Sequence, residues 1–334
     1  MSEWMWTCEA MCKCGSANWA VRVATLAACA LAFAGTVAAG PLASTDYGAT
    51  HHPPGPAPVA ARHHGGLYRI SGGGRVAYLF GTVHVGERSF YPMAPDAERA
   101  LGRADHIVVE LDTLAPDDFV RAFEKHGRYP AGDDIARHVS NDTLARLRTA
   151  LHGEGLSLAS MAHLKPWLLA NLLLSMTLER QGYHRSEGVE HELLAQARRR
   201  GARVAQLESA DFQLALFDSM SPVESERYLR ETLAGLCDGS LVGQAQRTIE
   251  AWRSGDSAAL DAVLRDATAG RSETAEFTRR KLLGLRNPDM AAQIDQLMGE
   301  GGVLFVGVGL LHLLGDNGLP QLLAQRGYLV ERVY

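Results

Sequence analysis

Cysteine is scarce in this sequence, and its placement excludes a fold held together by internal disulfides. Of the five cysteines, four lie within the first 29 residues, and Cys237 is the fifth. Once an N-terminal leader is removed, Cys237 has no cysteine with which to pair. A composition that is 46% apolar and 21% charged is typical of a globular protein, so a hydrophobic core must hold the fold.

Charge of one sign is also sparse. The 334 residues carry a formal net charge of −5 and no long run of like charge. Neither nucleic acid nor an anionic membrane surface is therefore an expected partner. Common hydrolase motifs are missing as well, because the sequence has no G-x-S-x-G and no H-E-x-x-H. The SGGG of residues 71–74 is typical of a turn rather than of a phosphate-binding loop.

Long apolar runs are limited to one, near the N-terminus. Residues 23–39 are apolar and uncharged, with Lys13 and Arg22 before them. The basic flank, short apolar run and small residues predict a secretory signal over residues 1–39, and so an exported protein, periplasmic or extracellular. The run could instead be retained as a membrane anchor, or LAAC, ending at Cys29, could be a lipidation site.

The next segment lacks the periodicity that builds a core. Residues 40–66 are rich in Pro, Gly and Ala, which predicts a disordered linker. Its histidines are interpreted as solvated rather than metal-binding: His51, His52, His63 and His64. The folded domain is predicted to span residues 67–334.

Hydrophobic periodicity and turn residues in that domain predict an α/β fold. Strands are expected at residues 67–70, 75–80, 106–112, 202–209, 303–308 and 328–333, the first two forming a hairpin. Helices are expected at 95–104, 116–126, 141–152, 166–180, 190–200 and 319–326. A helical stretch from 211 to 298 is expected to break at Ser221-Pro222, Asp238-Gly239, Gly255 and Asn287-Pro288. This order predicts a central mixed β-sheet flanked by helices, with a large helical insertion.

Polar side chains follow four of the predicted strands. Two strands lead to a glycine and then a histidine, and two end in a glutamate: Gly81 with His84, Gly309 with His312, Glu110, and Glu208. Ligands of open α/β sheets bind at the carboxyl ends of the strands, so four parallel strands would place all four groups in one crevice. Each glycine is interpreted as the residue that lets its strand turn sharply.

Two imidazoles and two carboxylates form a donor set suited to a divalent ion such as Mn, Co or Zn. Such an ion lowers the pKa of a bound water, and a spare carboxylate could take the proton. A second interpretation stays open, in which each histidine is structural and each glutamate is a cap or a surface group. Haem held through a histidine is a third.

Two further segments place charged groups at predicted helix ends. Glu190 opens a helix, where a carboxylate suits the positive end of the dipole, and it is interpreted as capping rather than catalytic. Arg286 and Asn287 fall between two predicted helices. An arginine there could clamp an anion or cap a helix.

These residues also carry a resemblance to a known family. Six segments occur in order: YLFGTVHVG, ADHIVVELD, LKPWLLA, GVEHELLAQARRRGARVAQLES, LLGLRNPDMAAQI and GVLFVGVGLLHLLGDNGLPQLLAQRGYLVERV. Together they span about residues 67–333. The chain resembles the TraB/PrgY/GumN family, and within it the GumN-type bacterial branch.

The resemblance implies a metal-dependent hydrolase, because the family includes the animal TIKI metalloproteases, and a fold of the erythromycin esterase/ChaN-like type. It implies that His84 and His312 hold the ion with Glu110, Glu208 or both. A carboxylate left over would activate water, and Arg286 would position the substrate, an unidentified peptide or small molecule, or stabilise an oxyanion. Glu190 and Asn287 match other family positions, whereas Gln206 stands where the family has glycine.

One alternative comes from a different class of protein. GumN is named for a gene cluster of exopolysaccharide synthesis, and membership of a fold does not fix a substrate. The chain could instead be a non-catalytic envelope protein that binds a ligand or partner in exopolysaccharide synthesis or export.

Overall fold

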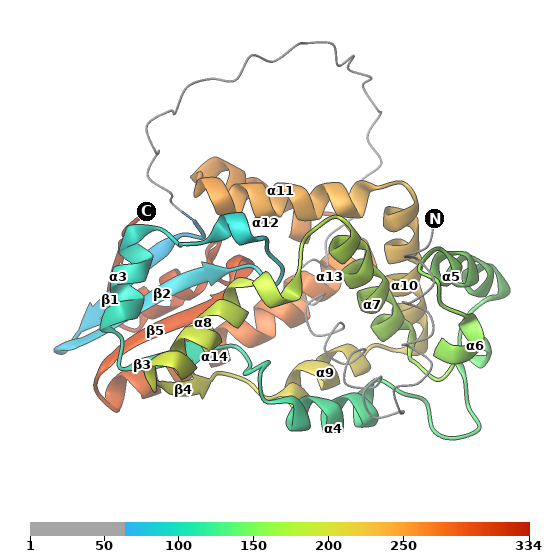
Figure 1. Ribbon diagram of the computed structural model, residues 1–334, viewed down its shortest axis with the longest axis horizontal. Coiled ribbons are helices and arrows are strands. Elements are labelled where there is room, and N and C mark those ends of the chain that lie inside the picture. The colour runs from blue at the N-terminus through green and yellow to red at the C-terminus, as the bar shows by residue number, and fades with distance from the viewer. Residues whose placement is uncertain (1–63) are drawn as a thin grey trace, which may run out of the picture.

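The computed structural model describes residues 64–334 (Figure 1). The predicted signal over residues 1–39, and the predicted linker up to residue 63, lie outside the described residues. His64 and the two glycines after it are described, and here the prediction of a solvated linker is wrong. His64 is 5% exposed and stacks on Trp252, with ring centroids 4.9 Å apart. The Gly65 N–H donates to the carbonyl of Trp252 at 2.7 Å.

Six strands form one mixed sheet in the order β4-β3-β5-β2-β1-β6. Their bounds are β1 Leu67–Gly72, β2 Arg75–Thr82, β3 His106–Val109, β4 Arg203–Gln206, β5 Val303–Gly309 and β6 Leu329–Arg332. The four strands β4, β3, β5 and β2 are parallel, and β1 pairs antiparallel with both β2 and β6. The mixed sheet is as predicted, and the four strands that end in polar groups are parallel, which is the condition for their side chains to meet at one edge.

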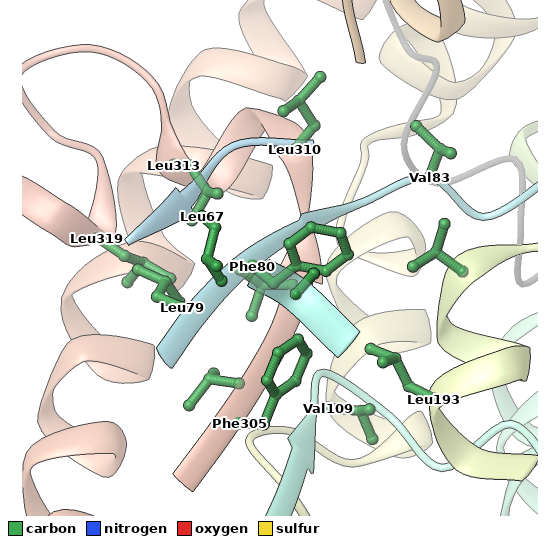
Figure 2. Packing of buried hydrophobic residues seen from close by; sticks show 14 of the residues in the cluster. Leu67, Leu79, Phe80, Val83, Val109, Leu193, Phe305, Leu310, Leu313 and Leu319 are labelled. Carbon is green, nitrogen blue, oxygen red and sulfur yellow. The ribbon is translucent and has the colours of Figure 1, made fainter. Parts of the chain in front are cut away.

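The apolar runs of β2 and β5 explain why these strands lie at the centre. Nearly every residue in the second half of β2 and almost all of β5 is buried, as expected for parallel strands covered on both faces. Gly73 and Gly74, with φ of 57° and 77°, form the tight turn of the predicted hairpin between β1 and β2. Figure 2 shows Phe80 and Phe305 on these strands packing together, with Leu193 of a covering helix beside them.

Helix α7 Pro166–Arg180 contributes Leu174 and Leu178 to a core that six further helices form with the sheet. The six helices are α3 Pro95–Arg103, α8 Val189–Arg200, α11 Ser240–Ser254, α12 Ser257–Thr268, α14 Arg286–Gly299 and α15 Leu319–Gln325. The short helices η2 Arg88–Phe90, η4 Arg185–Glu187 and η6 Leu310–Leu313 lie in the connections. Sheet and helices together form the α/β unit that the sequence predicts.

The helical insertion forms a second core, called here the helical lobe. It contains α4 Pro116–His126, η3 Ile135–Arg137, α5 Asn141–Gly153, α6 Leu158–Met161, α7 Pro166–Arg180, α9 Ala210–Asp218, α10 Pro222–Cys237 and α13 Glu273–Phe277. α7 packs against α10, and α4 against α9, so the lobe is built from chain segments on both sides of β4. Helix α7, expected at residues 166–180, is apolar and buried in the core. Among residues 64–334 no helix is long and apolar enough to cross a membrane.

The predicted break at Asn287-Pro288 is wrong. α13 continues through the π-helix η5 Thr278–Leu285 into α14, and the residues that join them keep helical backbone angles. A proline inside an α-helix clashes with the carbonyl four residues earlier. Here that carbonyl belongs to the wider π segment, which leaves room for the ring. Arg286 therefore lies inside one continuous helix, at the change from π to α geometry.

Candidate functional site

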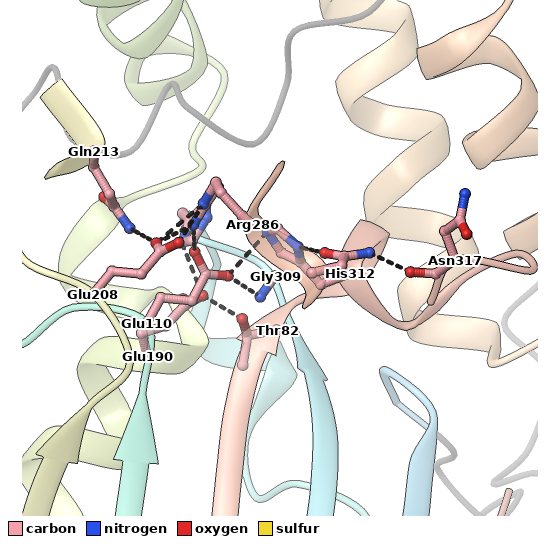
Figure 3. A network of polar contacts seen from close by, with 11 residues as sticks. Thr82, Glu110, Glu190, Glu208, Gln213, Arg286, Gly309, His312 and Asn317 are labelled. Carbon is pink, nitrogen blue, oxygen red and sulfur yellow. Dashed lines mark hydrogen bonds and ion pairs between the residues drawn. The ribbon is translucent and has the colours of Figure 1, made fainter. Parts of the chain in front are cut away.

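The structure brings the predicted strand-end residues together at one edge of the sheet. Thr82 at the end of β2 lies opposite Gly309 at the end of β5, and Val109 at the end of β3 lies opposite Gly307. The parallel strands thus end nearly level. The side chains that follow them meet in a single polar network, which Figure 3 shows above the strand ends.

The two glycines of the motif are required for close approach rather than for a sharp turn. Neither Gly81 nor Gly309 has a positive φ, so the predicted reason is wrong. A Cβ on Gly81 would lie 2.2 Å from the carbonyl oxygen of Gly65. The backbone of Gly309, with φ −51° and ψ 137°, suits any residue, but a Cβ there would enter the polar network.

The space in front of Gly309 is where the predicted ligands converge. A Cβ on Gly309 would lie 3.0 Å from Glu110 Oε1, 3.6 Å from His312 Cδ2 and 3.6 Å from His84 Nε2. His84 Nε2 and His312 Cδ2 are therefore separated by no more than twice 3.6 Å. Both imidazoles therefore border the same position in front of Gly309, and their sharing of one ion stays a prediction.

Asn287 fixes the orientation of the His312 ring. His312 Nδ1 lies 2.5 Å from Asn287 Oδ1, and the amide nitrogen of Asn287 donates to the carbonyl of Asn317 at 2.7 Å. Because Nδ1 donates, the other ring nitrogen is the one with a free lone pair, and it lies 3.6 Å from Glu110 Oε1. Burial lowers the pKa of His312 to about 3, and the Arg286 charge adds to this effect against the attraction of Glu110.

Glu190 fixes the orientation of the His84 ring, as Asn287 does for His312. Glu190 Oε1 lies 2.8 Å from His84 Nδ1 and also accepts a hydrogen bond from the Thr82 hydroxyl. It is 6% exposed and lies in the first turn of α8, as predicted, but its carboxylate contacts His84 and Thr82. Burial opposes the charged form of His84, but the Glu190 carboxylate outweighs burial and raises the pKa of this histidine.

The backbone that carries His84 is held by a close contact with the start of α8. A Cβ on Gly188 would lie 2.3 Å from the His84 carbonyl oxygen, and the Val189 N–H donates to the carbonyl of Val83 at 2.9 Å. Helix α8 therefore places both Glu190 and the backbone against which His84 packs.

Arg286 forms a buried ion cluster with two of the predicted carboxylates. Its Nε lies 2.9 and 3.0 Å from the two oxygens of Glu208, and its Nη2 lies 2.7 Å from Glu208 Oε2 and 2.5 Å from Glu110 Oε2. Arg286 as a whole residue is 4% exposed. Burial disfavours its charge, but the two carboxylates outweigh burial and raise its pKa. The two carboxylates engage Nε and Nη2 of Arg286, and its contact with substrate or an oxyanion stays a prediction.

The cluster separates the roles of the two glutamates. Both oxygens of Glu208 accept from Arg286, and one also accepts from the Gln213 amide at 2.9 Å. Glu208 is thus poorly placed as an ion ligand. Glu110 instead directs Oε1 toward Gly309, whose N–H donates to it at 2.5 Å. Burial raises the pKa of Glu110, but Arg286 and the two histidines outweigh burial and lower it to about 2.

The donor chemistry at Gly309 fits a divalent ion, although no complete cage is formed. In residues 64–334 no group of three or more His, Cys, Asp or Glu side chains could hold an ion as arranged. Two atoms bound at about 2.1 Å to one ion lie about 3.4 Å apart at a tetrahedral angle, close to the 3.6 Å between His312 Nε2 and Glu110 Oε1. Each histidine also has its Nδ1 fixed by Glu190 or Asn287, as metal-binding histidines do.

Comparison with known proteins agrees with the ordered motifs. The sequence profile of the TraB/PrgY/gumN family matches residues 66–332, which includes every residue of the site. The chain belongs to the TraB/PrgY/gumN family. The family match covers both the sheet and the helical lobe, so the lobe is an integral part of the matched region.

Two relatives carry the name "Uncharacterized protein YbaP", one from Shigella flexneri and one from Escherichia coli strain K12. Each is 24% identical over 251 residues, which is 75% of this chain and 89% of the relative. No solved structure matches the chain. These comparisons establish the family but say nothing of a substrate.

Three residues of the network were not predicted. Thr82 and Gln213 bind the carboxylates of Glu190 and Glu208, and the Asn317 carbonyl orients Asn287. Thr82 lies inside the motif GTVH, so its place beside the histidine was a usable signal. Gln213 and Asn317 carry no sequence pattern that distinguishes them from other surface-type residues.

Proposed function

We propose that this protein is a metal-dependent hydrolase whose ion is held by His84, His312 and Glu110. The observation that carries the proposal is the space in front of Gly309, which is bounded by two imidazoles and one carboxylate oxygen. Two histidines and one carboxylate are a common donor set for divalent ions with open positions. When bound, a divalent ion supplies a Lewis acid and lowers the pKa of water.

The residues around the space support a division of roles. Glu190 and Asn287 hold the two imidazole rings through Nδ1, so that the opposite nitrogens face the site. The low pKa of His312 keeps its Nε2 unprotonated at neutral pH. Arg286 fixes Glu110 from the side opposite the space and keeps it ionised. We assign Glu208 the role of holding Arg286, in place of the predicted role of ligand or base.

The substrate class follows from family membership rather than from geometry. Because the family includes the TIKI metalloproteases, we propose that the bond cleaved is a peptide bond. We also propose that the protein is exported, since residues 1–39 have the pattern of a secretory signal. N-terminal sequencing of protein recovered from the periplasm should find a start near Gly40. Recovery of the protein only from the cytoplasm, with Met1 retained, would contradict export.

Elemental analysis and metal titration test the proposal directly. The purified protein should take up one equivalent of Mn²⁺, Co²⁺ or Zn²⁺, and the double variant His84→Ala, His312→Ala should take up none. His152→Ala is the matched control, because His152 is an exposed histidine of α5. Equal uptake by the wild type and the double variant would refute the ligand set. Uptake without metal-stimulated cleavage of any peptide in a mixed library would refute the hydrolase.

A further inference from the structure

A pocket of about 410 Å³ is lined by residues that directly follow Glu110 and Glu208 in the chain, together with residues of the helical lobe. Its base is formed by the residues that follow β3 and β4, and its walls are α4 and the first turn of α9. Figure 1 shows these two helices side by side at the bottom of the helical lobe. Leu111 follows Glu110 in the chain, and Ser209 follows Glu208. The pocket and the site therefore share the same two strand ends.

The pocket has an apolar floor. Leu111 and Phe119 are each 8% exposed, and Ala122 and Ala210 are each 2% exposed. Its volume falls within the range of pockets that bind small ligands, roughly 300–1,000 Å³. A pocket of this size and lining can receive an aliphatic or aromatic side chain.

The charged groups at the rim are already paired within the protein. Lys125 lies 2.8 Å from Asp211, and Arg121 forms an ion pair with Asp118 one turn away on α4. Asp112 at the base pairs with Arg198 at 3.2 Å, outside the pocket lining. With each charge neutralised by a neighbour, the rim favours neither an anion nor a cation. A bound group gains from the apolar floor and not from ionic contacts.

We propose that this pocket is a specificity subsite that binds an uncharged apolar side chain of the substrate, next to the bond presented at Gly309. The proposal rests on the proposed function, because only a substrate engaged at the strand ends would reach both places. An apolar side chain that fits such a pocket changes affinity by roughly 10- to 200-fold relative to a substrate that lacks it.

Binding of three capped tripeptides to the full-length protein tests the subsite by calorimetry. The probes are N-acetylated, C-amidated Gly-Phe-Gly, Gly-Lys-Gly and Gly-Gly-Gly. The phenylalanine peptide should bind at least about tenfold more tightly than the other two. In Ala115→Trp, which fills the pocket from an exposed position that makes no side-chain cap to α4, that preference should disappear. Ala145→Trp, at an exposed position of α5, should keep it.

The results separate this proposal from the proposed function. Equal binding of the three peptides, or a preference that survives in Ala115→Trp, would overturn the subsite while metal uptake and cleavage stay intact. Loss of the preference in Ala115→Trp supports the subsite if metal uptake and the melting temperature stay at wild-type values. Absence of metal uptake in the wild type would overturn the hydrolase, and a phenylalanine preference that Ala115→Trp abolishes would still establish the pocket.

Discussion

A methyl group on Gly309 is the sharpest probe of the site, because it would occupy the space on which the two imidazoles and Glu110 converge. The substitution Gly309→Ala leaves every ligand side chain in the sequence. It also keeps the backbone within the range open to alanine, since φ is −51° and ψ is 137°. The Gly309 N–H can still donate to Glu110. The only change is that the added methyl group fills the space in front of residue 309.

The expected magnitude follows from the three contacts. The new Cβ would lie 3.0 Å from Glu110 Oε1 and 3.6 Å from both His84 and His312. An ion bonded at about 2.1 Å to these atoms needs the same space. Metal affinity should therefore fall by at least about 100-fold, which is the upper end of what loss of a supporting residue costs. Stability should change little, because the roughly 0.4–1 kcal/mol gained from a less flexible unfolded chain offsets the tight contact with Glu110.

Metal titration followed by calorimetry, with thermal unfolding on the same samples, measures both effects. A melting temperature within about 4 °C of the wild type would show that the fold is intact. Gly102→Ala is the matched control, because a Cβ on Gly102 of α3 meets no atom within 4 Å. Wild-type metal affinity and turnover in Gly309→Ala would refute the reasoning, since neither ion nor substrate would then use the space in front of this residue.

Three further changes follow from the same contacts. Arg286→Met leaves two buried carboxylates without their cation and should cost about 3–5 kcal/mol of unfolding free energy, measured in urea; a cost below 1 kcal/mol would contradict the ion cluster. Because burial lowers the pKa of His312 to about 3, the unfolded state binds more protons between pH 6.5 and 3, and stability falls as pH falls, by up to about 1.4 kcal/mol per unit. His312→Gln should make this slope shallower, and an unchanged slope would count against that assignment. Gly188→Ala should displace the His84 backbone by about 1 Å and reduce turnover about 100-fold; full activity would show that the contact yields without moving the ring.

Much of the fold could be predicted from local pattern alone. The run VLFVGV of β5 is apolar at every position except its glycine, which suits a parallel strand covered on both faces. Parallel strands in turn place their carboxyl ends at one edge, so the convergence of His84, Glu110 and His312 required only the strand assignments. The site followed from topology, not from the spacing within any one motif.

The side-chain partners could not be predicted in this way. Thr82 and Glu190 are 108 residues apart, and Glu110 and Arg286 are 176 apart. A glutamate in the first turn of a helix suits the dipole in isolation, and the same carboxylate suits a histidine if one is packed against it. Only the tertiary contact between α8 and the end of β2 decides between these roles for Glu190.

The close backbone approach at Gly81 and the continuous helix through Pro288 were also not predicted. Both depend on structure that no local sequence pattern reports. Gly81 is required because the backbone of Gly65 passes against it, and no local pattern reports a neighbour so placed. Proline predicts the end of a helix when the preceding turn has α geometry. The π segment that relieves the clash has no recognised sequence signal, so the break at Asn287-Pro288 was the expected outcome of a sound rule.

The uninterrupted helix from Glu273 to Gly299 contributes residues to both hydrophobic cores. Phe277 and Leu282 on its first half belong to the helical lobe, whereas Met290 and Ile294 on its second half belong to the core of the sheet. Arg286 lies between these two halves and donates hydrogen bonds to the carboxylates of Glu110 and Glu208 at the strand ends. A change in the packing of either core would therefore be expected to displace the Arg286 guanidinium. The position of Arg286 at the strand ends therefore depends on both cores, and we expect the two cores to unfold in one cooperative transition.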